Sequence, residues 1–223
     1  MCHVSTVGAI EALRRAKEDL SDEAADFYTG MADAAYEASR DNVEFSPVPA
    51  VEHGFSVTCE VTPHHIALTG TEEPDIRAFV NPPLRSEDAR LFIIDAIRAG
   101  TVACIATDHA PHTLEDKAKG APGFTGIETS YGVCNTVLVK EGQISARRLS
   151  QLMSSNPARI LGLNKGLLKT GYDADLTVVN PDEQWTVDSK LFCSKGKATP
   201  FDGKKLYGRV KAVFINGRNV FQK

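Results

Sequence analysis

Three short apolar runs along the chain each end in a polar tip that carries histidine or an acid, and each tip precedes a helical pattern. The clearest run covers residues 102–106 and ends abruptly in Thr-Asp-His. A second covers 54–61 and ends in Thr-Pro-His-His, and a third, at the very start, ends at His3. Because the carboxyl ends of parallel strands in a (β/α) barrel meet at one mouth, we expect these three tips to converge.

Between and after these runs, apolar residues recur at helical spacing, which predicts an α/β fold. Gly100 is expected to end one of these helices as a C-cap. Residues 113–127 are polar and contain several glycines, which predicts a mobile loop directly after the Thr-Asp-His tip. The helices are predicted at 7–20, 22–41, 87–99, 128–139 and 145–154, and another short one starts at Asn156-Pro157.

From residue 172 the pattern changes to short strands and turns, which predicts a small β module distinct from the α/β part. Asn216-Gly217 is typical of a type I′ hairpin turn. We therefore divide the chain into an α/β part at 1–165, which carries an insert at about 20–53, and a β part at 166–223. The strands of the β part are predicted at 174–179, 184–187, 210–215 and 219–221.

Composition narrows the choice of partner and compartment. The chain has 223 residues, of which 42% are hydrophobic and 24% charged, as in ordinary globular domains. A net charge of −4 does not favour nucleic acid or a membrane surface as a partner. The five cysteines are odd in number and lack CxxC spacing, which predicts reduced thiols in a cytoplasmic protein. They are Cys2, Cys59, Cys104, Cys134 and Cys193.

Asp108 is the strongest candidate for chemistry. A carboxylate at the tip of a buried strand can bind a divalent metal and also shuttle a proton. Taken alone, the motif has an equally plain alternative, in which a polar turn follows the strand and Asp108 caps the next helix. The three convergent tips favour a site.

At this point the chain resembles the dihydroorotase family, in the amidohydrolase superfamily, close to the hydantoinases and allantoinases. The resemblance covers nearly the whole chain except residues 20–53, and NPPLR and DHAPHT favour dihydroorotase over its cousins. It rests on HVST at 3–6, TCEVTPHH at 58–65, NPPLR at 81–85, ATDHAPHT at 106–113, NPARILGL at 156–163 and TPFDG…GRV at 199–210.

The resemblance implies the C-terminal part of a metal-dependent-hydrolase TIM (β/α)8 barrel, followed by part of a small β-sandwich. It implies reversible hydrolysis of the cyclic amide of (S)-dihydroorotate to N-carbamoyl-L-aspartate in pyrimidine biosynthesis. Two zinc ions would activate a hydroxide; manganese or cobalt would suit similar ligands. His3 would bind one metal, and Asp108 would bind the other and carry the proton.

By the same resemblance, His112 would hold the substrate carboxylate and Asn81 would bind the pyrimidine ring. The backbone at Pro122 and Gly123 would meet the substrate. Ordinary turns at Asn81 and at Pro122-Gly123 are the alternative reading. We expect supporting roles at the site for Glu60 and His109, and a role in shaping the loop for His64 and His65.

The chain departs from the family pattern at its start. The family's HxH motif, bridging lysine and further histidine have no counterpart here, so barrel strands one to five are absent and three strands cannot close a barrel. We expect a C-terminal half that is inactive alone, from an incomplete coding sequence, with a split gene or a degenerate copy as alternatives.

Two other functions stay open from the sequence. One is a hydantoinase- or allantoinase-type cyclic amidohydrolase. The other is a non-catalytic dihydroorotase-like subunit that pairs with aspartate carbamoyltransferase. Besides a small-molecule substrate, the expected partners are a second copy of the chain or the missing N-terminal half.

Overall fold

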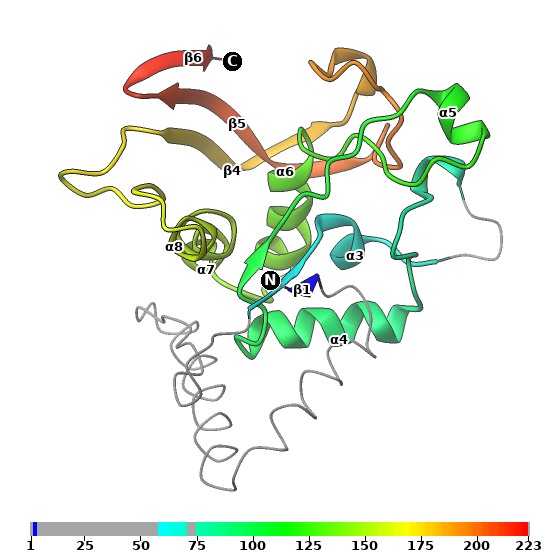
Figure 1. Cartoon of the computed structure of the whole chain (residues 1–223), viewed down its shortest axis with the longest axis horizontal. Coiled ribbons are helices and arrows are strands. Elements are labelled where there is room, and N and C mark those ends of the chain that lie inside the picture. The colour runs from blue at the N-terminus through cyan, green and yellow to red at the C-terminus, as the bar shows by residue number, and fades with distance from the viewer. Residues whose placement is uncertain (1, 4–57, 71–74, 223) are drawn as a thin grey trace, which may run out of the picture.

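The structure is a computed structural model that describes the backbone of Cys2–His3 and residues 58–70 and 75–222. It contains a parallel sheet and an antiparallel sheet, with helices between and around them (Figure 1). The helices predicted at 7–20 and 22–41, the insert at 20–53 and the first part of the strand at 54–61 lie outside the described residues.

The parallel sheet brings the three predicted strand tips to one edge. Its strands are β1 (Cys2–His3), β2 (Cys59–Val61) and β3 (Cys104–Ile105), in the order β1-β2-β3. His3 pairs in register with Glu60, and Glu60 with Cys104. The strands are shorter than predicted, although Ala103 and Ala106 extend the pairing through backbone bonds of 3.0 and 2.9 Å to β2. The convergence of the tips is confirmed, and the described strands do not close a barrel.

Two helices follow the tip of β2 and lead towards β3. Helix α3 (Pro63–Ala67) starts at Thr62, whose side chain accepts from the backbone N–H of His65. A short helical turn, η1 (Ile76–Ala78), comes next. Helix α4 (Glu87–Arg98) confirms the amphipathic helix predicted at 87–99, because its apolar face is buried and Gly100 follows it with φ of 75°.

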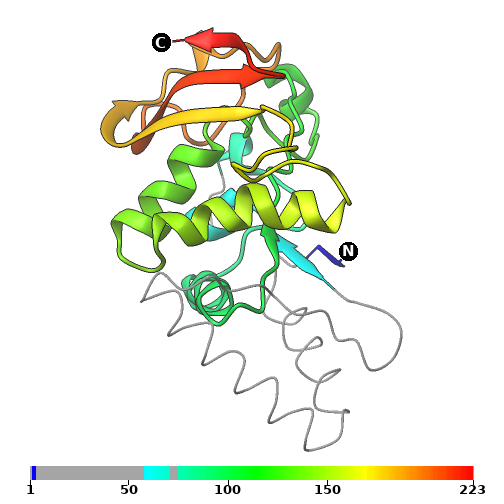
Figure 2. The ribbon, with the colours of Figure 1, turned by 90° about the vertical axis from the view of Figure 1, so that its left-hand side faces the viewer.

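Two longer helical rods cover the parallel sheet from the other side. The first joins α6 (Ser130–Cys134) to the π-helical η2 (Asn135–Lys140). The second joins α7 (Ala146–Ser150), the π-helical η3 (Gln151–Ser155) and α8 (Asn156–Ile160), as Figure 2 shows. The short helix predicted to start at Asn156-Pro157 is confirmed as α8, and it follows η3 without a break. The backbone bonds of a π-helical turn join residues five apart, so the i to i−4 bond that Pro157 would break is already absent.

The antiparallel sheet is a meander of β4 (Leu176–Thr186), β5 (Lys205–Ile215) and β6 (Arg218–Gln222). Asn216 and Gly217 both have positive φ, 49° and 74°, as a type I′ turn requires, so the predicted hairpin is confirmed. The strands predicted at 174–179 and 184–187 form one strand, whose register shift between Asn180 and Gln184 absorbs the residues between them.

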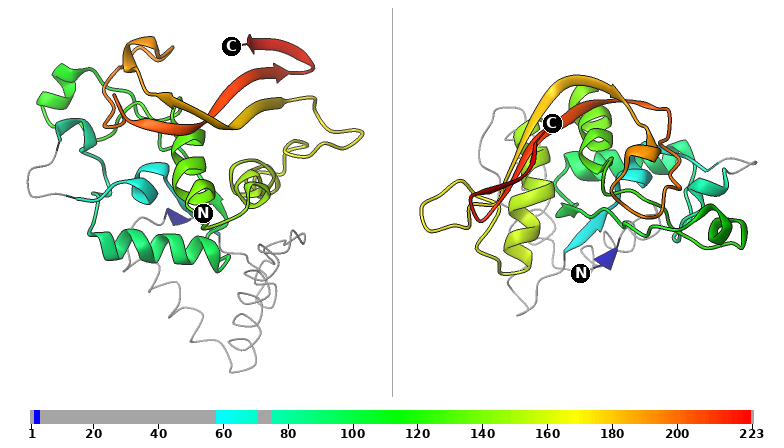
Figure 3. Two further views of the ribbon diagram at one scale, coloured as in Figure 1. Left: turned by 180° about the vertical axis from the view of Figure 1, so that it is seen from behind. Right: turned by 90° about the horizontal axis from the view of Figure 1, so that it is seen from above.

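This sheet packs on α6, as Figure 3 also shows. The contact is close at Gly132, where an added Cβ would lie 3.2 Å from the ring of Trp185. The hydroxyl of Thr136 accepts from the backbone N–H of Tyr207 at 2.8 Å, and thereby joins η2 to β5. A further turn, η4 (Ser189–Leu191), lies between β4 and β5.

The buried apolar residues form two clusters. One lies around the parallel sheet, α4 and the two rods. The other, which we call the loop cluster, joins residues of the loops after α3 and β3 to residues of α6, the 187–201 segment and β5. Its members are Val80, Phe124, Val133, Val187, Phe192, Phe201 and Leu206. The loops that carry the candidate site residues are therefore anchored in apolar packing.

None of the helices within the described residues is both long and apolar enough to cross a membrane. The division of the chain at 165/166 and the location in the cytoplasm stay predictions.

Replacing Asn156 with alanine is expected to lower the free energy of unfolding by about 1–3 kcal/mol. The buried Nδ2 of Asn156 donates to the carbonyl of Ala103 at 2.8 Å, beside β3, and the substitution would leave that carbonyl without this donor. Urea unfolding of the native full-length protein measures the change. Asn219→Ala, on the exposed β6, is the control and should shift stability by less than about 0.5 kcal/mol. Equal stability of the two variants would contradict the prediction.

Candidate functional site

Asp108 lies just beyond β3 in a backbone conformation that few side chains adopt. Its φ is 50°, in the left-handed region, where Asp and Asn are the best tolerated residues after glycine. Its side chain is 39% exposed, and its Oδ2 lies 3.8 Å from Nε2 of His64. Asp108 does not cap the next helix: α5 (Leu114–Ala118) is capped by Thr113, which forms a capping box with Asp116. The capping alternative for Asp108 is therefore wrong.

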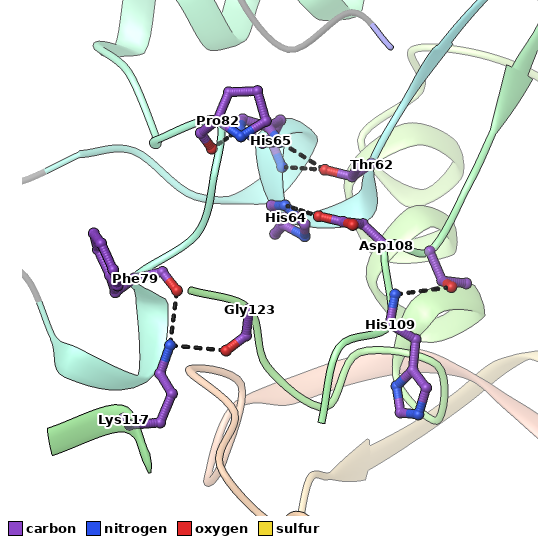
Figure 4. Close-up of polar contacts among 10 residues, drawn as sticks. Thr62, His64, His65, Phe79, Pro82, Asp108, His109, Lys117 and Gly123 are labelled. Carbon is purple, nitrogen blue, oxygen red and sulfur yellow. Dashed lines mark hydrogen bonds and ion pairs between the residues drawn. The ribbon is translucent and has the colours of Figure 1, made fainter. Parts of the chain in front are cut away.

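The two buried histidines of α3 face this tip and the neighbouring loop (Figure 4). Nε2 of His65 lies 3.1 Å from the carbonyl of Pro82 and must donate to it, because a carbonyl can only accept. Nδ1 of His65 then accepts from the hydroxyl of Thr62 at 2.7 Å. His65 thus shapes the loop, as predicted. The ring of His64 packs edge-on against Phe124, with centroids 5.1 Å apart, and presents Nε2 to Asp108.

Backbone hydrogen bonds join the three segments that carry the other candidates. The N–H of Gly123 donates to the carbonyl of Phe79 at 2.9 Å, and that of Ala110 to the carbonyl of Phe124 at 3.1 Å. Gly123 has φ of 106°, and a Cβ on it would lie 2.6 Å from the Cβ of Ala110. Glycine is therefore required at 123, where the loop passes against the segment that follows Asp108.

The predicted substrate contacts lie on these segments. Asn81 and Pro122 are exposed, Gly123 is buried and His112 is half-buried. The backbone of His112 lies against Gly196, where an added Cβ would be 2.8 Å from the carbonyl oxygen of His112. The hydroxyl of Thr125 donates to the carbonyl of Gly196 at 2.7 Å, so one segment supports both the 108–113 and the 122–125 segments.

Glu60 and His109, the two residues expected to support the site, make different contacts. Glu60 sits on the central strand, and its Oε2 is 3.9 Å from Sγ of Cys104. Burial, together with the charge of Glu60, raises the pKa of the Cys104 thiol to about 11. The ring of His109 points away from the carboxylate of Asp108 (Figure 4), and its Nδ1 accepts the backbone N–H groups of Gly126 and Ile127, both at 3.3 Å. His109 therefore ties the strand tip to the loop.

Lys117 is the residue that sequence reasoning missed. Instead of an irregular mobile loop throughout 113–127, the structure contains the capped helix α5, and Lys117 on this helix is completely buried. In sequence it stands in Glu-Asp-Lys-Ala-Lys, which is typical of an exposed, charged helix. No local signal distinguishes it from Lys119.

The donor atoms of the site are of the types that bind zinc, but those in the described part of the chain do not make a complete set of zinc ligands. Among the described residues, no group of three or more His, Cys, Asp or Glu side chains could hold a metal. Asp108 offers one partly exposed carboxylate at the tip of β3. The backbone of His3 lies at the same edge of the sheet, and its side chain is outside the described residues. Carboxylate and imidazole are zinc ligands, and a catalytic zinc normally takes three protein ligands.

Comparison with known proteins places the chain among relatives about twice its length. It is 49% identical over 176 residues to the dihydroorotase of Clostridium botulinum (strain Eklund 17B / Type B), a match that covers 79% of the chain and 44% of the relative. It is 40% identical over 231 residues to the dihydroorotase of Caldanaerobacter subterraneus subsp. tengcongensis, covering 100% of the chain and 45% of the relative. The chain thus spans just under half the length of the curated relatives it matches, as expected from the missing motifs.

Solved structures give the same result for the fold. The L-hydantoinase (dihydropyrimidinase) from Arthrobacter aurescens is 28% identical, with a TM-score of 0.71 over 86% of this chain and 42% of that one. The D-hydantoinase (dihydropyrimidinase) from Thermus sp. has the same fold over 87% of this chain and 48% of that one, with a TM-score of 0.71 at 24% identity. The model of the amidohydrolase family matches residues 7–220. The chain belongs to the amidohydrolase family.

Proposed function

We propose that the protein is a dihydroorotase, which hydrolyses the cyclic amide of (S)-dihydroorotate reversibly to N-carbamoyl-L-aspartate. The observation that carries the proposal is the placement of Asp108. Its exposed carboxylate stands at the tip of a buried parallel strand, in a left-handed backbone conformation. Strained backbone of this kind clusters at active sites. Similarity to the curated dihydroorotases supports the choice of substrate.

Asp108 would act as both a metal ligand and the proton carrier. Zinc, held by Asp108 and His3 together with further ligands, would supply Lewis-acid activation of water and of the amide carbonyl. A carboxylate beside a dication stays ionised, so Asp108 can accept the proton of the attacking water and deliver it to the leaving amide nitrogen. His64, 3.8 Å from Oδ2, would help to orient this carboxylate.

The neighbouring loops would bind and orient the substrate. The exposed Asn81 would hydrogen-bond the pyrimidine ring, and His112 would hold the carboxylate. The N–H of Gly123 is already committed to the carbonyl of Phe79, which favours the carbonyl of the exposed residue Pro122 as the backbone contact. Gly123 would then serve by letting the loop approach Ala110 closely. Glu60 and His109 would support the site from the sheet and from the loop.

Turnover of dihydroorotate by the purified native full-length protein, loaded with zinc, tests this function. We expect opening of dihydroorotate and, in reverse, cyclisation of N-carbamoyl-L-aspartate. Hydantoin and allantoin serve as competing substrates, and a higher kcat/KM for either one would replace the proposal with a hydantoinase or allantoinase. A folded protein without turnover of any of the three, which copurifies with aspartate carbamoyltransferase, would indicate a non-catalytic subunit.

Removal of the metal is expected to abolish this turnover and leave most of the fold in place. Asp108 and His3 lie at one edge of the parallel sheet, whereas the fold is held by two clusters of buried apolar residues that include neither proposed metal ligand. Dialysis against a chelator followed by addition of zinc, with activity and circular dichroism measured at each step, checks this. Full activity of protein shown to be free of metal would contradict the metal-dependent mechanism.

A further inference from the structure

The ammonium group of Lys117 is buried at the junction of two loops. Its Nζ donates to three backbone carbonyls: Phe79 at 2.7 Å, Gly123 at 2.8 Å and Ala121 at 3.0 Å. The side chain is 0% exposed, and the Nζ also lies 5.6 Å from the centroid of the Phe79 ring (Figure 4). An ammonium has three N–H donors, and these three carbonyls use all of them.

Burying an ammonium group costs more free energy than burying an apolar side chain in the same space. Burial disfavours the charged form and lowers the pKa of the Lys117 ammonium, and Asp75 only partly offsets this through its charge. An apolar side chain would avoid the desolvation of a charge. What lysine provides, and an apolar residue cannot, is a set of bonds between segments that lie 38 residues apart in sequence.

The carbonyls that Lys117 holds flank the proposed substrate contacts. Phe79 precedes Asn81 by two residues, and Ala121 and Gly123 stand on either side of Pro122. The carbonyl of Phe79 also accepts the N–H of Gly123, so both loops meet at this one oxygen.

The far side of Asn81 is held independently. Nε2 of His65 donates to the carbonyl of Pro82, the residue after Asn81. Lys117 in turn is held on α5 by the capping box of Thr113 and Asp116. Asn81 therefore lies between two anchors, one from α5 and one from α3.

We propose that Lys117 is a positioning residue, which fixes the Asn81 loop and the Pro122 loop relative to each other and thereby sets the affinity for substrate. This inference rests on the proposed function, because that function assigns substrate contacts to Asn81 and Pro122. It assigns no contact with the reacting atoms to Lys117. Displacement of both loops should weaken substrate binding more than it slows the chemistry at Asp108.

The test compares Lys117→Met, Lys117→Gln and Lys119→Met in the native full-length protein. Met keeps the length of the side chain without a donor, and Gln restores two N–H donors. Lys119 caps the end of the same helix, and its exposed side chain forms an ion pair with Glu115, so Lys119→Met is the matched control. We expect KM for dihydroorotate to rise about tenfold or more in Lys117→Met, with a smaller fall in kcat and unchanged zinc content. Lys117→Gln should recover part of the loss, and the control should match wild type.

A merely structural role gives a different result. Val133→Ala removes volume from the loop cluster, where Val133 is 1% exposed, and serves as a variant of lowered stability. If Lys117→Met changes KM no more than Val133→Ala does, or if Gln recovers nothing, the positioning role is overturned. Failure of both Lys117 variants to fold overturns it as well.

Hydrogen exchange separates this inference from the proposed function. The amides of residues 79–81 and of Ala121, Gly123 and Phe124 should exchange faster in Lys117→Met than in Lys119→Met, because the two loops lose their shared anchor. Unchanged exchange overturns the anchoring whatever the activity. If wild type does not turn over dihydroorotate, the proposed function fails and the substrate part of the inference fails with it, while exchange still decides the anchoring.

Discussion

Substitution of Asp108 by asparagine is expected to lower kcat/KM for dihydroorotate by about a thousandfold. Asparagine has nearly the same shape and also tolerates the left-handed conformation that Asp108 adopts, with φ of 50°. The fold should therefore be retained. The variant lacks the negative charge, one metal ligand and the group that accepts and delivers the proton. Steady-state kinetics and the zinc content of the purified variant measure the effect.

The control for this substitution is Asp95→Asn. Asp95 is exposed on α4, pairs with Arg98 at 3.3 Å and is not one of the proposed site residues. Its loss should leave kcat/KM within about twofold of wild type, because exposed ion pairs contribute little. Retention of more than a tenth of wild-type kcat/KM by Asp108→Asn would show that another group carries the proton.

Substitution of Leu152 by alanine is expected to lower the free energy of unfolding by about 2–5 kcal/mol. Leu152 is completely buried on η3, in the rod that packs against β3, and alanine would leave a cavity there. Leu161, at the end of the same rod, is 64% exposed, and Leu161→Ala should change stability by less than about 0.5 kcal/mol.

Urea unfolding of both leucine variants in the native full-length protein makes this comparison. The difference between them isolates burial, because the residue removed and the residue introduced are the same. A Leu152→Ala variant as stable as Leu161→Ala would mean that the rod does not cover the parallel sheet as described.

Local periodicity and turn chemistry predicted the parts of the fold that depend on neighbours in sequence. The amphipathic pattern at 87–99 predicted helix α4, whose apolar face is buried. Asn216-Gly217 supplies the positive φ values of a type I′ turn. The position of Asp108 at the tip of β3 was also predicted from sequence, because Thr-Asp-His ends the apolar run at 102–106. The prediction that the chain contains only part of the barrel rested on the absence of the family's HxH motif, bridging lysine and further histidine.

The features that sequence could not predict depend on partners far along the chain. Lys117 is buried because carbonyls at Phe79 and Gly123 surround it, and nothing near Lys117 in sequence indicates them. The orientation of His109 depends on two N–H groups at 126–127. The rod through Pro157 continues because of a π-helical turn, which no local pattern marks. All the predicted site roles stay predictions, namely those of His3, Glu60, Asn81, Asp108, His109, His112, Pro122 and Gly123.

The loop cluster has a consequence for how this protein can be recombined with its relatives. Val80 and Phe124 come from the loops at the proposed site, whereas Val187, Phe201 and Leu206 come from the C-terminal part of the chain, and all pack together. A chimera that exchanged only the segment after residue 165 would place one protein's side chains against another's at this cluster. Poor packing in the loop cluster would displace the loops that Val80 and Phe124 anchor. Substrate affinity in such chimeras should therefore depend on a segment that need not touch the substrate.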